Sequence, residues 1–316
     1  MSKKMWGYLM HLSDNMWGDP GSRLLEPCYH PVLTTDQDVW DNTINFLPSQ
    51  GINFVLIDVG DAMQYERHPE ISVEGAWSKD KLKAELDRMR SMGLTPYPKL
   101  NFSAGHDAWL GVYSRMLSTP TYYQVCKDCI EEVAEVFGTP EFFHLGLEEE
   151  DSVNQGALSM IIVRQMELLW HDIFKLFSFV EGAGCTPWIW SGLAWNEKDL
   201  PIFLERMPRD VLQSNYWYNR LKKLPNGKYQ HHAINVYGIL DEAGFKQIPT
   251  VSFFEGYSLN AEQTLTMGKN DLTDSLLLGY MTAPWRNPRP NNRYSLLDDA
   301  YRFGLAKKKI YPEECE

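Results

Sequence analysis

The chain has 316 residues, 44 % of them hydrophobic and 23 % charged, which is ordinary for one large globular domain. Its formal net charge of −12 argues against a nucleic-acid backbone or an anionic membrane as partner. No stretch approaches the roughly 20 apolar residues that span a bilayer, and the amino terminus lacks the apolar run and cleavage site of a signal peptide. We therefore expect a cytoplasmic protein, or a secreted or periplasmic one if a signal has been removed.

Eight short runs of β-like composition follow one another along the chain, and a helix-like stretch or room for one follows each. The runs cover residues 6–12, 54–60, 95–102, 142–147, 186–191, 211–218, 250–257 and 276–285. Helices are predicted after Ser78, after Thr119-Pro120, over 157–180, over 292–308 and, more faintly, over 231–243. This alternation is typical of an α/β fold of the (β/α)8 TIM-barrel type, so residues 1–316 are predicted to form a single barrel domain.

The five cysteines are too few, and odd in number, for a disulfide framework. Cys126 and Cys129 form a C-x-x-C pair, but they share one helical stripe with Tyr122 and Val133. This stripe predicts burial in a core and neither a metal nor a redox site, because no second C-x-x-C completes a zinc site. We expect no metal and no organic cofactor.

The stretch 142–151 reads FFHLGLEEED, an apolar run that ends in four consecutive acids. Its apolar part predicts a buried strand of a parallel sheet. Carboxylates crowded at a strand tip repel one another, so at least one pKa should rise, as a general acid at neutral pH requires. We interpret Glu150 and Asp151 as the start of a solvated loop or of a helix, and assign the chemistry to Glu148 and Glu149.

In a TIM barrel the active site gathers at the carboxyl ends of the strands. Acids and aromatic residues dominate these predicted ends and histidines are scarce, which favours glycosidic chemistry over metal chemistry. The chain also carries 11 Trp and 16 Tyr, and sugar rings stack on aromatic faces. The strand-end residues besides the four acids are His11, Asp14, Asn15, Asp58, Asp61, Asn101, His106, Trp190, Trp195, Tyr216, Trp217, Tyr218, Asn219, Glu255, Tyr257, Trp285 and Asn287.

Four segments carry recognisable motifs: 98–106 reads PKLNFSAGH, 144–149 reads HLGLEE, 68–77 reads HPEISVEGAW and 279–285 reads GYMTAPW. They are similar, respectively, to P-E-[IL]-D-x-P-G-H, H-[IL]-G-G-D-E, Y-P-x-L-x-x-x-G-A-[WY] and G-x-x-x-x-x-W. Each is weak alone, but their order and spacing together resemble the β-N-acetylhexosaminidase family of glycoside hydrolases, over most of the predicted barrel.

This resemblance implies hydrolysis of a glycosidic bond by a substrate-assisted mechanism. Glu149 would then be the general acid, and Glu148 would orient the acetamido oxygen of the substrate as the nucleophile. His106 and Asp58 would support the site, with Asp61 as a rival for the role of Asp58. The implied partner is a carbohydrate or glycoside substrate.

Aromatic residues would wall the sugar pocket. The resemblance assigns this role to Trp285 and Trp190, and the strand-end positions add Trp217, Tyr218 and Glu255 as candidates for substrate binding. The tryptophans at 188 and 190 in the fifth run share one face of their strand. Their spacing alone does not tell whether this face points into the barrel or towards the helices.

The chain also departs from the family pattern. Glu148 replaces an Asp and Leu147 replaces a Gly, while Trp6, Asn219 and Asn287 stand where the family has an Arg, an Asp and a Glu. These departures leave the identity of the sugar open. A non-catalytic carbohydrate-binding barrel derived from such an enzyme is the alternative.

Glu255 offers a second mechanism, in which it attacks the anomeric carbon while Glu149 remains the acid. A retaining pair of this kind stands about 5–5.5 Å apart. A structural role for Glu255, in an ion pair with Arg286 or Arg289, is an equal expectation. A metal-dependent hydrolase would need a second histidine two residues after His11, and the chain has a serine there.

Overall fold

A computed structural model describes residues 3–18, 29–156 and 158–315 of the chain. Its strands are β1 (Met5–His11), β2 (Phe54–Asp58), β3 (Thr95–Lys99), β4 (Phe142–His144), β5 (Thr186–Trp190), β6 (Leu212–Ser214), β7 (Thr250–Val251) and β8 (Gly279–Thr282). Its α-helices are α1 (Gln37–Phe46), α2 (Lys79–Ser91), α3 (Pro120–Val136), α4 (Met166–Gly182), α5 (Leu200–Arg206), α6 (His232–Glu242), α7 (Asn260–Asp271) and α8 (Arg293–Ile310). Short 3₁₀ turns are η1 (Leu47–Gln50), η2 (Pro69–Ile71), η3 (Ala108–Arg115), η4 (Ser191–Trp195), η5 (Pro290–Asn292) and η6 (Pro312–Glu314).

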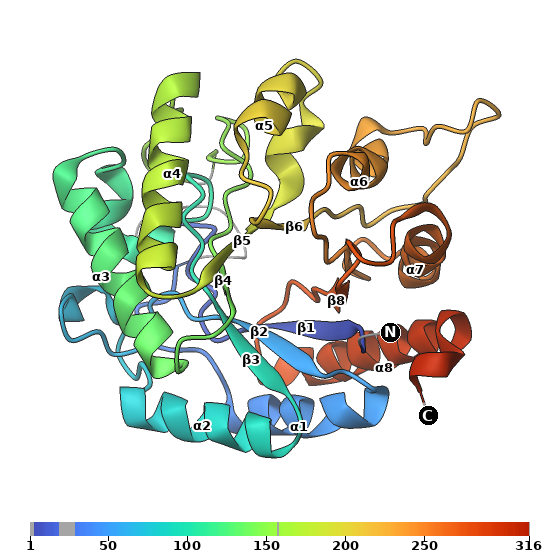
Figure 1. The fold of residues 1–316 in the computed structure, drawn as a ribbon. Coiled ribbons are helices and arrows are strands. Elements are labelled where there is room, and N and C mark those ends of the chain that lie inside the picture. The colour runs from blue at the N-terminus through green and yellow to red at the C-terminus, as the bar shows by residue number, and fades with distance from the viewer. Residues whose placement is uncertain (1–2, 19–28, 157, 316) are drawn as a thin grey trace.

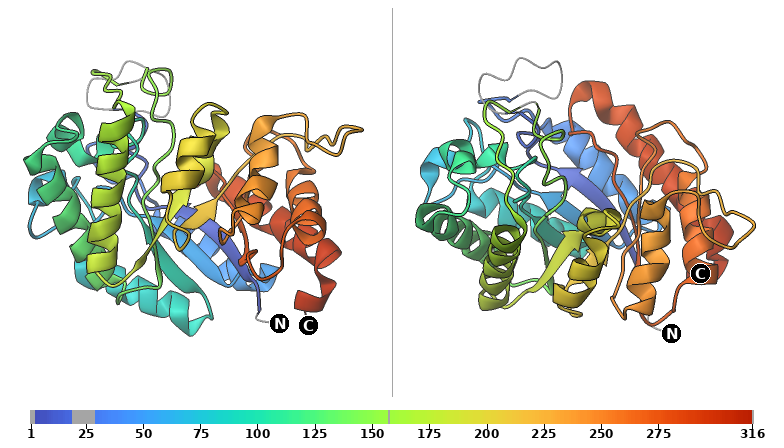
Figure 2. Two further views of the ribbon diagram at one scale, coloured as in Figure 1. Left: turned by 45° about the horizontal axis from the view of Figure 1, so that its top comes forward. Right: turned by 90° about the horizontal axis from the view of Figure 1, so that it is seen from above.

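The eight strands form one parallel sheet in the order β6-β5-β4-β3-β2-β1-β8-β7, with helices arranged around it (Figures 1 and 2). The two outer strands also approach each other: the N–H of Ile248 donates to Gln213 O, and that of Thr250 donates to Asn215 O, each at 2.9 Å. These bonds bring the sheet round on itself. The predicted (β/α)8 barrel is thus confirmed, with a strand in each predicted run, although β4, β6, β7 and β8 are much shorter than their runs.

The helix starts follow their capping residues. Ser78 accepts a hydrogen bond from the N–H of Lys81 at the start of α2, and Thr119 accepts one from Tyr122 at the start of α3. The prediction of a helix over 157–180 is wrong in its first part, because α4 begins only at residue 166. Ala157 itself lies outside the described residues. The side-chain amide of Gln155 bonds both the N–H and the C=O of Ile162, groups that a helix would use itself.

Side chains on the inner face of the strands fill the barrel. A layer of apolar residues comes first, contributed by all eight strands or the residues next to them: Leu9, Leu56, Tyr97, Phe142, Trp188, Leu212, Ile248 and Met281. Because side chains alternate along a strand, the residues two positions on also point inward. Trp190 belongs to this interior cluster together with Trp188, so both tryptophans face the lumen.

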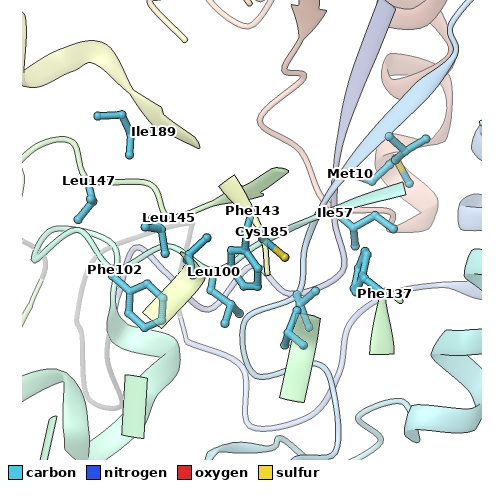
Figure 3. Close-up of a cluster of buried hydrophobic side chains, with 14 of the residues drawn as sticks. Met10, Ile57, Leu100, Phe102, Phe137, Phe143, Leu145, Leu147, Cys185 and Ile189 are labelled. Atoms are coloured by element: carbon cyan, nitrogen blue, oxygen red, sulfur yellow. The ribbon is translucent and has the colours of Figure 1, made fainter. Parts of the chain in front are cut away.

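The outer face of the sheet packs against the helices. Figure 3 shows part of this second core, in which Met10, Ile57 and Phe143 come from strands and lie among other buried apolar side chains. Cys126 and Cys129 of α3 are fully buried in it, as their helical stripe predicts. Among the described helices, none has both the length and the apolar character that crossing a membrane requires.

Candidate active site

A row of ionisable side chains forms the floor at the carboxyl ends of the first four strands. The strand register pairs His11 with Asp58, Asp58 with Lys99, and Lys99 with His144. All four residues are buried, and Lys99 Nζ forms an ion pair with Asp58. His11 Nδ1 lies 3.3 Å from the same carboxylate. Lys99 is not among the site residues predicted from the sequence, although a lysine at an inward position of a barrel strand is itself a signal.

Electrostatics fix the charge states on this floor. Burial alone would raise the pKa of Asp58, but the charge of Lys99 and the nearby His11 outweigh it and lower this pKa below its usual value. Burial lowers the pKa of His144 well below its usual value, and the charge of Lys99 lowers it further. His144 is therefore neutral, and its Nδ1 accepts a hydrogen bond of 3.0 Å from the N–H of Gly146.

The backbone beyond β4 turns sharply before it reaches the acids. Gly146, Leu147 and Glu149 all have positive φ angles, of 75°, 62° and 54°. Glycine is required at 146 because an added Cβ would lie 1.9 Å from Asn101 Oδ1. Left-handed conformations in non-glycine residues persist only where surrounding contacts enforce them, and they concentrate at functional sites.

Glu148 is the buried member of the acid pair, with 3 % of its surface exposed. Its N–H donates to Ser103 Oγ at 2.9 Å, and its carboxyl group is a hydrogen-bond partner of the Tyr216 hydroxyl. Burial raises the pKa of Glu148 to about 7, and the charge of Glu149 adds to the rise, while His106 opposes it. One pKa in the acid stretch is thus raised, at Glu148, but burial is its main cause and crowding with Glu149 a smaller one.

Glu149 lies nearer to solvent and contacts His106. Its side chain is 36 % exposed, and its Oε2 lies 3.1 Å from His106 Nε2. His106 Nδ1 lies 4.0 Å from Glu148 Oε1, too far for a hydrogen bond, so this imidazole lies between the two acids and contacts Glu149. Burial lowers the pKa of His106, but the hydrogen bond to Glu149 and the charges of both acids outweigh burial and raise it. The cluster holds at least one transferable proton near neutral pH.

Aromatic rings surround this cluster. The Trp285 ring, at a residue with φ of 52°, lies 5.8 Å from that of Trp190, 6.3 Å from Tyr218 and 5.6 Å from His11. Trp17 completes the wall, 6.4 Å from Trp285 and 6.3 Å from the His106 ring. Trp17 is not predicted from the sequence, since it lies beyond the first run in a segment without periodicity.

Several buried polar atoms of the cluster have no hydrogen-bond partner within the described part of the chain. They include Trp190 Nε1, His106 Nδ1, Asn101 Nδ2 and His144 Nε2. Buried polar groups in folded proteins are normally paired, so unpaired ones need an explanation. Free donors and acceptors lined by aromatic rings suit a polar ligand with an apolar face, such as a sugar.

Two predicted site residues lie apart from this cluster. The Trp217 ring stacks on His231 at 4.6 Å, and its Nε1 donates to the C=O of Arg220 at 3.3 Å. Glu255 is exposed and contacts Asn219 Nδ2 at 3.5 Å. The predicted ion pair of Glu255 with Arg286 or Arg289 is wrong. Arg289 instead pairs with Asp14 at 2.6 Å, and the Arg286 guanidinium lies over the Phe254 ring.

Asp61, the alternative to Asp58 as a supporting residue of the site, makes a separate set of hydrogen bonds. Its carboxylate accepts hydrogen bonds from Ser13 Oγ at 2.5 Å and Asn15 Nδ2 at 2.8 Å. Burial raises the pKa of Asp61 to about 7, although these two hydrogen bonds oppose the rise. Within the described residues, no three His, Cys, Asp or Glu side chains come together to hold a metal ion.

The last two acids of the fourth run differ from each other. Asp151 is exposed, as predicted, and its carboxylate accepts hydrogen bonds from the N–H groups of Val153 and Asn154. The prediction that Glu150 starts a solvated loop is wrong, because its side chain is only 6 % exposed and pairs with Arg164. The four acids therefore have four different environments.

The raised pKa of Glu148 predicts a pH dependence of stability. Its ordinary pKa is 4.5 and its folded-state pKa is about 7, so between these values the folded protein keeps a proton that the unfolded chain has lost. Stability should fall as the pH rises through this interval, by at most about 1.4 kcal/mol per unit of pKa difference. Urea unfolding of wild type and Glu148→Gln between pH 4.5 and 8 measures this loss. Parallel pH profiles of the two proteins would contradict it.

No family model and no curated protein matches the sequence, whereas many solved structures match the fold. The chitobiase of Flavobacterium johnsoniae is 15 % identical with a TM-score of 0.62, and the match covers 89 % of this chain and 49 % of that one. The Vibrio harveyi exo-β-N-acetylglucosaminidase, solved in complex with N-acetylglucosamine, is 12 % identical with a TM-score of 0.61, and the match covers 99 % of this chain and 57 % of that one. Dispersin B is 14 % identical with a TM-score of 0.59, over 97 % and 99 %.

This chain thus spans about half the length of the chitobiase it matches, and nearly all of dispersin B. At such low identity the likeness establishes the fold alone. The chain folds as a (β/α)8 barrel of the kind seen in solved β-N-acetylhexosaminidases, the family whose motifs its sequence resembles.

Proposed function

We propose that this protein is a glycoside hydrolase of the β-N-acetylhexosaminidase type. The observation that carries the proposal is the placement of His106 between Glu148 and Glu149, at the mouth of a barrel lined with Trp17, Trp190 and Trp285. One acid is buried with a pKa of about 7 and the other is partly exposed. Acids in contrasting environments are what acid–base chemistry at neutral pH requires.

In the proposed reaction, Glu149 gives its proton to the departing glycosidic oxygen. The acetamido oxygen of the substrate attacks the anomeric carbon as the bond to that oxygen breaks, and Glu148 orients the acetamido group. Water then opens the resulting ring, and Glu149 takes a proton from it. The greater exposure of Glu149 supports its role at the leaving-group side, while the burial of Glu148 beside Tyr216 supports a role against the sugar.

The covalent route through Glu255 has less support. A nucleophile must reach the anomeric carbon from within the pocket, held by the residues around it. Glu255 is exposed, and its described side-chain contact is a long one to Asn219. We therefore favour attack by the substrate's own acetamido group.

A carbohydrate-binding barrel without catalysis is the second candidate. Lys99 and Asn101 stand in the third-strand segment where the family motif has two acids, and Lys99 neutralises Asp58 on the floor. Loss of acids beneath the sugar favours binding without turnover. Such a protein would bind sugars while hydrolysing none of them.

A panel of aryl β-glycosides, with and without a 2-acetamido group, tests the proposal. We expect hydrolysis restricted to the acetamido sugars, because only they supply the internal nucleophile. Hydrolysis of plain hexosides would contradict the substrate-assisted mechanism and favour a nucleophile in the protein. Binding measured by calorimetry without any turnover would favour the sugar-binding alternative.

A further inference from the structure

The buried carboxylate of Glu150 links the loops that carry the proposed catalytic groups. Its Oε1 accepts a hydrogen bond of 3.2 Å from the N–H of Ala104, two residues before His106. Its Oε2 lies 2.5 Å from Arg164 Nη2, an ion pair in which both side chains are almost fully buried. Glu150 therefore connects the loop after β3 with the segment that leads into α4.

Further contacts join the loop after β3 directly to the turn after β4. The N–H of Glu148 donates to Ser103 Oγ at 2.9 Å. The backbone of Gly105 passes so close to Glu149 that an added Cβ would lie 2.9 Å from its carbonyl oxygen. The loops thus meet along their length, and the strained φ of Glu149 lies between these contacts.

Arg164 is itself anchored to the helical shell. Its Nη1 lies 3.0 Å from Asp172 Oδ2 of α4, and that carboxylate also accepts hydrogen bonds from Ser118 Oγ and the Tyr123 hydroxyl, each at 2.5 Å. Tyr123 belongs to α3. The Glu150–Arg164 ion pair therefore connects the turn that carries the acids to helices α3 and α4.

We propose that Glu150 and Arg164 are positioning residues for Glu149. Their ion pair holds the turn after β4 in its left-handed conformation, so that the Glu149 carboxylate meets His106. Strain of this kind needs surrounding contacts to maintain it, and a buried charge pair anchored to two helices provides them. The catalytic consequence rests on the proposed function, whereas the contact between Glu149 and His106 does not.

Two variants test this role. Glu150→Gln keeps an acceptor oxygen for the N–H of Ala104 but removes the charge that Arg164 binds. Arg164→Met removes the anchor and leaves two buried acids unpaired, so it serves as a second variant if it folds. Arg206→Met is the matched control, because it breaks an ion pair of 2.7 Å between Arg206 and Glu167 that lies outside the site.

The first readout is the ring pKa of His106, measured by NMR. The groups that influence this ring are Glu149, Glu148 and Lys99. If Glu149 is released, the pKa of His106 should fall by about half a unit or more in Glu150→Gln, since its closest carboxylate is lost. Arg206→Met should leave it at the wild-type value.

The second readout is turnover of an aryl glycoside. Misplacing a catalytic group by about 1 Å can cost on the order of 10²-fold, so we expect kcat of Glu150→Gln to fall about 10- to 100-fold with KM within about twofold of wild type. In an active protein, an unchanged kcat in folded Glu150→Gln overturns the proposal. If wild type hydrolyses no glycoside, the proposed function fails but the His106 titration still decides, and an unchanged pKa overturns the positioning role.

Discussion

Replacing Glu149 with glutamine should lower kcat by about 10²- to 10⁴-fold, the range that a positioned general acid contributes. The amide has nearly the same shape but has no proton to give to the leaving oxygen. The melting temperature should hardly change, because the side chain is 36 % exposed and substitutions at such positions usually stay within about 0.5 kcal/mol. Steady-state kinetics with a panel of aryl glycosides, alongside thermal unfolding, measures both effects.

The leaving group separates this role from the alternative that Glu148, with its pKa of about 7, is the acid. A good leaving group departs without a proton, so the variant that lacks the acid should recover most of its activity on a dinitrophenyl glycoside. The variant that lacks the orienting acid should stay slow on every substrate. We expect recovery in Glu149→Gln and none in Glu148→Gln. The reverse pattern would show that Glu148 is the general acid and Glu149 the orienting residue. Full activity of Glu149→Gln on substrates with poor leaving groups would show that Glu149 has no catalytic role.

The barrel is predictable from the sequence because its signals are local. Apolar runs and helix caps such as Ser78 act within a few residues, whereas the face of each strand that points inward is known only from the structure. The end of β4 does not follow, because the apolar run continues to residue 147 whereas the strand ends at residue 144. The runs and the caps need no knowledge of which strand lies beside which.

The contacts that distinguish neighbouring acids are not local. Glu150 looks the same as Glu149 in the sequence, and only the fold brings Arg164, fourteen residues on, to one of them. Trp17 reaches the site from a loop without periodicity. Trp217 points away from its neighbours: Tyr216 and Tyr218 face Trp190 and Trp285, and the Trp217 ring stacks on His231. Side-chain direction beyond a short strand such as β6 depends on packing that the sequence does not specify.

Replacing Lys99 with methionine should cost about 3–5 kcal/mol of unfolding free energy, because breaking a buried ion pair leaves one uncompensated charge. Lys99 and Asp58 are both almost completely inaccessible, and the ammonium is the principal cation beside that carboxylate. Without Lys99, the largest influence that opposes burial is lost, and the pKa of Asp58 should rise. The loss should therefore be smaller at pH 5 than at pH 8, because the buried carboxyl group takes up a proton more readily at the lower pH. Urea unfolding at both pH values measures the difference.

A double variant separates the buried charge from the lost packing. Lys99→Met combined with Asp58→Leu removes both charges, and apolar replacements of buried ion pairs are often neutral, so it should recover most of the stability. Lys223→Met, which breaks the solvent-exposed pair with Asp271, is the matched control and should cost less than about 1 kcal/mol. If the double variant is as unstable as Lys99→Met, the uncompensated charge of Asp58 is not the cause of the loss. In that case the fit of the lysine and aspartate side chains into the floor of the barrel matters more than the pairing of their charges.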